Sequence, residues 1–142
     1  MKICVDTSIL LDILKDEFIE YQEKLYEALR RKEELIAPAI VAAELVPQFK
    51  GDTKLLQSFL HDHKIVIKSL DIDSALLAAS RWMRYLKRKT KVKCPECGHK
   101  LDLREHVLSD FYIGGFALTE CDVILTRDRG IYRKYFPDLK NY

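Results

Sequence analysis

Four acidic residues stand beside apolar segments of this sequence: Asp6, Glu44, Asp110 and Asp128. Asp6 and Asp128 each follow a short apolar run typical of a buried strand, whereas Glu44 and Asp110 fall on or beside apolar helical faces. A carboxylate is costly to bury unless a cation neutralises it. Several carboxylates in one place repel one another without a divalent ion, and such hard oxygen ligands suit Mg²⁺ or Mn²⁺. The pattern therefore predicts a metal site that can activate water for attack on a phosphodiester.

Each acid also has an ordinary structural interpretation when it is taken alone. Asp6 can cap a helix, Glu44 can pair with a surface lysine, Asp110 can belong to an amino-terminal turn, and Asp128 can form an Asx turn before Gly130. We favour the shared site because two acids at strand ends and two on apolar helical faces converge on one region.

The elements that must position these acids follow from the hydrophobic periodicity. Short apolar strands are predicted at 2–5, 35–37, 65–67 and 123–125. Helices are predicted around 7–14, 18–29, 38–50, 55–60, 76–86, 105–118 and 131–136. Thr7 or Ser8 is expected to cap the first helix, and Pro38 to occupy a first-turn position. This alternation predicts an α/β fold, a three-layer α/β/α sandwich with a central parallel sheet. Ligands of such sheets bind at the carboxyl ends of the strands, where Asp6 and Asp128 fall.

Length and composition limit the class of protein. The chain has 142 residues, of which 48% are hydrophobic and 32% charged, with a net charge of +2. This predicts one domain over residues 1–142 and argues against a disordered chain. No apolar stretch reaches the roughly 18 residues of a membrane helix, and no secretory segment follows the first residues. We therefore expect a cytoplasmic protein without a membrane partner.

A basic segment interrupts the helical pattern. The regular spacing stops at Lys87, and residues 87–103 are predicted to be an insertion between helices. Eight Lys or Arg residues lie between 81 and 100 against the single acid Glu96. Such charge can hold an RNA backbone through phosphate contacts, although a solvated surface is the more common explanation of such a run. Nearby Trp82 and Tyr85 are expected to pack in the interior.

The insertion contains the sequence Cys94-Pro-Glu-Cys97-Gly, which resembles one knuckle of a zinc ribbon. A structural zinc ion needs four ligands, and His106 is the candidate that completes the pair most easily. Other candidates are His99, His61 and His63, or the same knuckle of a dimer partner. A reduced thiol pair, or a remnant of a larger ribbon, is the alternative to a zinc site. Cys4 and Cys121 are expected to be small apolar core residues.

The segments around the four acids resemble those of the PIN-domain nucleases, especially the VapC-type toxins. The segments are VDTSILLDIL at Asp6, AAELV at Glu44, LSDFYIGGFAL at Asp110 and ILTRDRGIYRKYF at Asp128. The resemblance spans the chain apart from the insertion. It implies Mg²⁺- or Mn²⁺-dependent endonucleolytic cleavage of single-stranded RNA, with Asp6 and Asp110 as the main metal ligands and Glu44 and Asp128 in support. It also implies a homodimer and, for a toxin, a cognate antitoxin.

Two other functions are compatible with the sequence. A PIN nuclease of ribosomal-RNA maturation is the first, because some of these enzymes carry zinc ribbons. A catalytically inactive RNA- or protein-binding module is the second. A dehalogenase-type phosphatase is disfavoured, because the first strand is followed by Asp6-Thr7-Ser8 and lacks the second aspartate of the Asp-x-Asp pattern.

Overall fold

Strands and helices alternate along the chain in a computed structural model that describes residues 1–89, 93–99 and 107–142. The strands are β1 (Lys2–Val5), β2 (Glu34–Pro38), β3 (Ile65–Lys68) and β4 (Val123–Leu125). The helices are α1 (Thr7–Lys15), α2 (Ile19–Arg30), α3 (Ala39–Leu45), α4 (Thr53–Asp62), α5 (Ile72–Lys89), α6 (Leu108–Glu120) and α7 (Arg129–Tyr135). A 3₁₀ turn, η1 (Val46–Phe49), follows α3.

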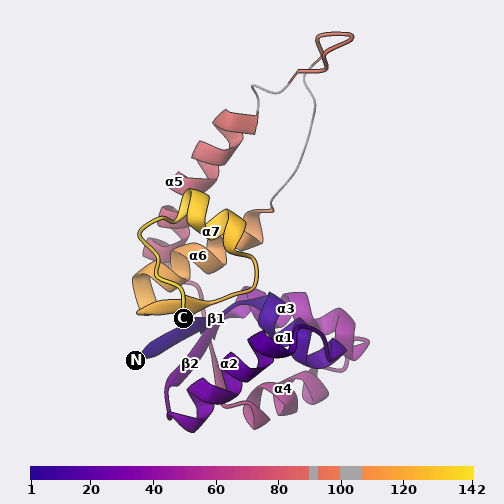
Figure 1. Cartoon of the computed structure of the whole chain (residues 1–142), viewed down its shortest axis with the longest axis vertical. Coiled ribbons are helices and arrows are strands. Elements are labelled where there is room, and N and C mark those ends of the chain that lie inside the picture. The colour runs from indigo at the N-terminus through magenta and orange to yellow at the C-terminus, as the bar shows by residue number, and fades with distance from the viewer. Residues whose placement is uncertain (90–92, 100–106) are drawn as a thin grey trace.

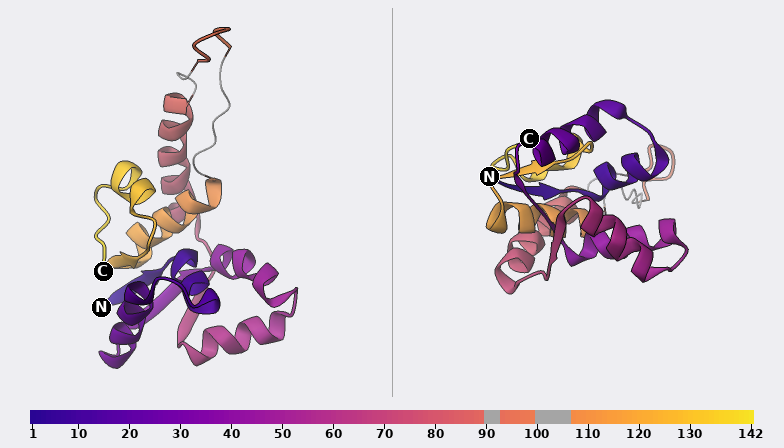
Figure 2. Two further views of the ribbon diagram at one scale, coloured as in Figure 1. Left: turned by 45° about the vertical axis from the view of Figure 1, so that its right-hand side comes forward. Right: turned by 90° about the horizontal axis from the view of Figure 1, so that it is seen from below.

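The four strands form one parallel sheet in the order β3-β2-β1-β4. The two central strands are apolar, and Ile3, Cys4, Val5 and Ile36 are fully or almost fully buried. Helices cover both faces. In the view from below in Figure 2, the dark purple α2 lies on one face of the sheet and the orange α6 on the other. The predicted three-layer α/β/α architecture with a parallel sheet is confirmed.

Helix α6 packs closely against its neighbours because two adjacent glycines remove side chains at the contacts. A Cβ atom on Gly114 would lie 2.6 Å from the ring of Phe136, and one on Gly115 would lie 2.6 Å from the carbonyl oxygen of Ser74. These glycines therefore let α6 approach both the end of α7 and α5. The approach fixes the position of the amino-terminal turn of α6, which carries Asp110.

Some boundaries differ from the prediction. Pro38 is the last residue of β2 and precedes α3, because its extended backbone still pairs with β3. Asp6, not Thr7 or Ser8, occupies the N-cap position of α1. Helix α5 continues to Lys89, past the break expected at Lys87, and it extends away from the sheet in Figure 1. The start of α6 predicted at Glu105 lies outside the described residues.

The predicted packing of four single residues agrees with the structure. Cys4 is fully buried in β1, and Cys121 lies at the end of α6 against the core, as expected. Tyr85 is buried, and Trp82 packs on it and on Phe111, so these two aromatic residues belong to the interior. No helix within the described ranges combines the length and the apolar character that crossing a bilayer requires.

Candidate active site

Asp6 lies at the carboxyl end of β1 and is only 5% exposed. Its Oδ2 atom accepts a 2.7 Å hydrogen bond from Ser8 Oγ and another of 2.7 Å from Thr126 Oγ1. Tyr132 donates a longer bond, 3.4 Å, to Oδ1. Burial raises the pKa of Asp6, the two hydroxyl bonds oppose that rise, and the charge of Asp128 adds to it. Asp6 is thus a desolvated carboxyl group held by neutral donors.

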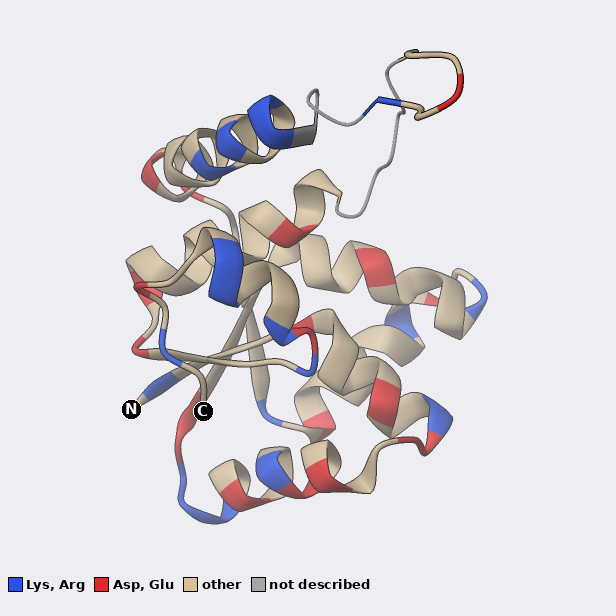
Figure 3. Ribbon diagram, turned by 45° about the horizontal axis from the view of Figure 1, so that its top comes forward, with Lys and Arg blue, Asp and Glu red and all other residues tan. Residues whose placement is uncertain are grey.

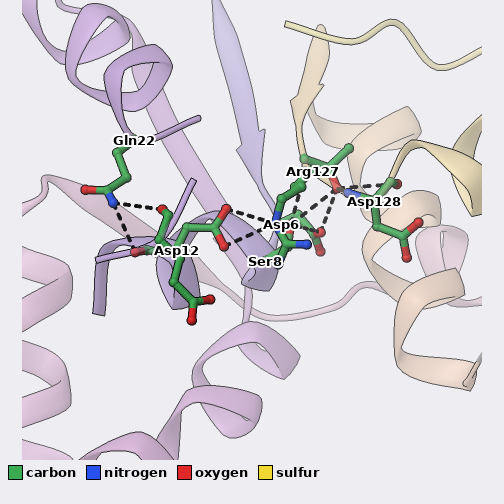
Figure 4. Close-up of polar contacts among 8 residues, drawn as sticks. Asp6, Ser8, Asp12, Gln22, Arg127 and Asp128 are labelled. Atoms are coloured by element: carbon green, nitrogen blue, oxygen red, sulfur yellow. Dashed lines mark hydrogen bonds and ion pairs between the residues drawn. The ribbon is translucent and has the colours of Figure 1, made fainter. Parts of the chain in front are cut away.

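The two hydroxyls that hold Asp6 are themselves fixed by the loop that follows β4. The backbone N–H of Arg127 donates to Ser8 Oγ at 3.1 Å, and the N–H of Asp128 donates to Thr126 Oγ1 at 3.0 Å. Each hydroxyl therefore accepts a hydrogen bond from a backbone N–H and donates its one proton to Asp6. Figure 4 shows these contacts converging on Asp6, with Asp128 beside them. The Asp6 carboxylate is oriented by the very loop that carries Asp128.

Glu44 reaches the same region from α3, which follows the neighbouring strand β2. It is partly buried, and its Oε1 atom accepts a 3.1 Å bond from Thr7 Oγ1. Burial is the largest cause of its raised pKa; the Thr7 bond lowers that pKa, and the charges of Asp6 and Asp110 raise it further. These effects place Glu44 within electrostatic reach of two of the other three acids.

Asp110 and Asp128 complete the set. Asp110 lies in the first turn of α6, where its carboxylate accepts a 3.3 Å bond from the backbone N–H of Val107. Asp128 is exposed at the N-cap position of α7. The phenol of Tyr132 is almost fully buried, and its pKa is raised by burial and by the charges of Asp6, Asp110 and Asp128. The fold thus brings all four predicted acids into one electrostatically coupled region, which we call the acidic cluster.

The donor set of the acidic cluster fits a hard divalent cation. Among the described residues, no Lys, Arg or His forms an ion pair with Asp6 or Glu44. Two partly or fully buried carboxyls therefore repel each other without local compensation, and a Mg²⁺ or Mn²⁺ ion is the usual solution. Within the described ranges, no three acidic, His or Cys side chains form a ready-made metal cage. The fit rests on the chemistry and charge of the donors.

A second buried aspartate was not anticipated from the sequence. Asp12, in α1, is 1% exposed, and both of its carboxylate oxygens accept from Arg127 Nε, at 3.1 and 3.0 Å. The Arg127 guanidinium also lies over the ring of Phe18, 4.1 Å from its centroid. Gln22 donates to the backbone carbonyl of Asp12. The available signal was an aspartate among the apolar residues of the first predicted helix.

The structure describes only some of the predicted zinc ligands. Cys94 and Cys97 lie beyond the carboxyl-terminal end of α5, at the top of Figure 1. The predicted ligand His106 lies outside the described residues. His61 and His63 belong to α4 and its end, at the bottom of Figure 1, and His63 packs on Phe59. Among the described residues, these histidines do not join the two thiols in a group that could hold a metal ion.

In a comparison with known protein families, residues 3–137 match the PIN domain. The match includes all four acids of the acidic cluster. No curated protein matches the sequence.

Proposed function

This chain belongs to the PIN domain family, whose members are nucleases that bind RNA, and we propose that it is an Mg²⁺- or Mn²⁺-dependent endoribonuclease that cleaves single-stranded RNA. The observation that carries this proposal is the uncompensated charge of Asp6 and Glu44. A structural role would be served by a cation from the chain, as Arg127 serves Asp12. Buried carboxylates that have no cationic partner in the chain are suited to bind a metal ion from solution.

We assign the roles within the acidic cluster as follows. Asp6 and Asp110 are the principal metal ligands, and Glu44 and Asp128 complete or tune the site. A bound divalent ion would supply charge stabilisation at the phosphate and a water molecule that is more easily deprotonated. The protein's own contribution is orientation: Ser8 and Thr126 fix the Asp6 carboxylate, and Thr7 fixes Glu44. Such supporting bonds hold ligands in a productive geometry.

Basic residues offer the substrate a second point of contact. Figure 3 shows Lys and Arg positions along the outer part of α5, and Arg84 and Arg88 in this helix are exposed. Arg81 on the same helix is already paired with Asp138 and so is not available in the same way. We propose that the exposed members contact RNA phosphates outside the acidic cluster, a contact that carries no sequence preference.

The biological role that we favour is the toxin of a type II toxin–antitoxin pair. This proposal is supported by the similarity of the four acidic segments to VapC-type toxins. It includes a homodimer, a cytoplasmic location and a cognate antitoxin that blocks the acidic cluster. Maturation of ribosomal RNA is the alternative enzymatic role, and RNA or protein binding without cleavage is the non-enzymatic one.

Cleavage of a labelled single-stranded RNA by the purified chain tests the activity. We expect cleavage with Mg²⁺ or Mn²⁺, none with a chelator, and none with Asp110→Asn. Asp62→Asn is the matched control, because Asp62 is an exposed acid of α4 with no place in the acidic cluster. Full activity of Asp110→Asn would contradict the catalytic assignment. RNA binding without metal-dependent cleavage would favour the non-enzymatic role.

Expression in a bacterial host separates the two enzymatic roles. A toxin arrests growth when it is expressed alone, and Asp6→Asn relieves the arrest. A maturation enzyme instead leaves growth unaffected on expression, and its loss from the native organism leaves a ribosomal-RNA precursor uncleaved.

A further inference from the structure

Residues 93–99 form a tight turn around two cysteines, which we call the knuckle. The backbone N–H of Cys94 donates to the carbonyl of His99 at 2.7 Å, and the N–H of Gly98 donates to the carbonyl of Cys94 at 2.9 Å. Gly98 has a φ of +71°, a left-handed conformation that favours glycine. The sequence Cys-Pro-Glu-Cys-Gly thus adopts a closed turn around its first cysteine.

The knuckle leaves both of its thiols available to a metal ion, which binds cysteine as the thiolate. Both cysteines are free, Cys94 is partly exposed and Cys97 is exposed. The knuckle therefore presents two sulfur ligands to solvent.

Two ligands leave a structural zinc site half complete, since such sites hold four in a tetrahedron. Within the part of the chain that the structure describes, no third His, Cys, Asp or Glu joins the two thiols in a group that could hold a metal ion. The other described cysteines, Cys4 and Cys121, belong to the core at the sheet. Any further ligands must therefore come from outside this described part of the chain.

We propose that Cys94 and Cys97 are half of a tetrathiolate zinc site, and that the same two cysteines of a second copy of this chain complete it. A two-fold axis through the ion supplies an identical pair at the same distance, as in other symmetric dimers. The position of the knuckle allows this, because it projects beyond α5, clear of the remaining helices (Figure 1). Soft thiolates select zinc, so this site is chemically distinct from the hard acidic cluster.

The helix that leads to the knuckle offers independent support for a second copy. Ile72, Leu76 and Met83 lie on one side of α5 at helical spacing, and they are 69%, 62% and 51% exposed. Ala79, between them, is exposed as well. Apolar side chains spaced in this way are typical of a seam between two parallel helices. Parallel pairing of α5 with its copy would bury this stripe and bring the two knuckles to the same end of the dimer.

The zinc content of the whole purified chain, measured with its mass in solution, tests the proposal. We expect about one zinc ion per two chains, a zinc-bound dimer by native mass spectrometry, and thiolate-to-metal charge-transfer bands after cobalt substitution. Cys94→Ser and Cys97→Ser should each lose the ion while keeping the unfolding temperature of the folded domain. His99→Ala and His106→Ala are the matched controls and should keep both the ion and the ratio.

Three results would overturn the proposal. A zinc-free protein would show that the knuckle is a simple thiol turn. One ion per chain, or loss of the ion in His106→Ala, would show that the site is completed within one chain. Zinc retained in dimers that pair one wild-type chain with one Cys94→Ser/Cys97→Ser chain would show that a single knuckle is sufficient. None of these measurements involves RNA, so their outcome is independent of the proposed nuclease activity.

Discussion

Asp6 and Asp12 are two buried aspartates six residues apart that solve the same electrostatic problem in opposite ways. Asp12 is neutralised within the chain, because Arg127 bonds both of its carboxylate oxygens and is itself covered by the ring of Phe18. Asp6 receives neutral donors, among them the hydroxyls of Ser8 and Thr126, and its raised pKa reflects the burial that those donors do not offset. The Asp12 carboxylate is a structural ion-pair partner, whereas the Asp6 carboxylate remains able to bind a cation.

The same loop, which follows β4, contacts the surroundings of both Asp6 and Asp12. The Arg127 side chain pairs with Asp12, while the Arg127 backbone N–H fixes the Ser8 hydroxyl that bonds Asp6. The loop after β4 is therefore anchored to α1 by the ion pair of Arg127 with Asp12, and from that anchor it orients the Asp6 carboxylate, which has no cationic partner among the described residues. Stability and activity should then respond to different substitutions in the same few residues.

The largest expected effect is the loss of activity on replacing Asp6 by Asn. If Asp6 is a metal ligand, its loss should remove several kcal/mol of charge stabilisation, which corresponds to about a 1000-fold lower kcat/KM. The free energy of unfolding of the metal-free protein should stay the same or rise, because a desolvated charge is removed. RNA cleavage and urea unfolding on the same samples measure the two quantities. A large loss of stability would place Asp6 with Asp12 as a structural residue.

Replacing Arg127 by Met should have the opposite result: a loss of stability with little loss of activity. This change leaves the Asp12 carboxylate buried without its partner, and breaking such a pair costs about 3 kcal/mol. The backbone contact to Ser8 is kept, so the protein that remains folded should retain most of its kcat. The matched control is Asp12→Leu/Arg127→Met, which removes both charges and should recover most of the stability. Loss of activity in both variants, without loss of stability, would assign Arg127 to the substrate instead.

The two aspartates also show what could be predicted from the sequence. All four strands and the parallel architecture follow from local apolar runs that alternate with helical periodicity, so the carboxyl edge of the sheet was predictable. A strand end marks Asp6 as a candidate for the site. Glu44 and Asp110 are candidates because carboxylates on apolar helical faces are unusual.

The ion pair of Asp12 with Arg127 could not be predicted, because it joins α1 to the loop after β4 across 115 residues. Nothing in either local segment specifies that contact. The hydroxyl roles of Thr7 and Ser8 were misassigned for a related reason. A Ser or Thr at a helix start is ordinarily a cap, but here Thr7 bonds Glu44 from α3, and Ser8 bonds Asp6 while it accepts from the loop after β4.

A smaller effect is expected in the pH dependence of stability. Asp6 and Glu44 have pKa values raised above their ordinary values of 3.8 and 4.5. Over the range that begins at those values and extends upward, the folded state binds more protons than the unfolded state, so the free energy of unfolding falls as the pH rises. This decline should be reduced in Asp6→Asn. Saturating Mn²⁺ should weaken or reverse it, because the ion stabilises the ionised carboxylates. Chemical unfolding at a series of pH values, with and without Mn²⁺, gives both slopes.

The smallest effects should come from the hydroxyls, and their order tests which carboxylate matters more. Thr126→Val removes a 2.7 Å bond to Asp6 and the acceptor of the Asp128 N–H, whereas Thr7→Val removes one 3.1 Å bond to Glu44. Supporting bonds of metal ligands are typically worth 10- to 100-fold in affinity or activity. We expect a loss of kcat/KM at the low end of this range, about tenfold, for Thr126→Val, and a smaller loss of about threefold for the single, longer bond of Thr7. Valine matches threonine in shape, so packing is conserved, and the Mn²⁺ affinity of each variant should fall in the same order as its activity. The reverse order would make Glu44, not Asp6, the carboxylate on which the site depends.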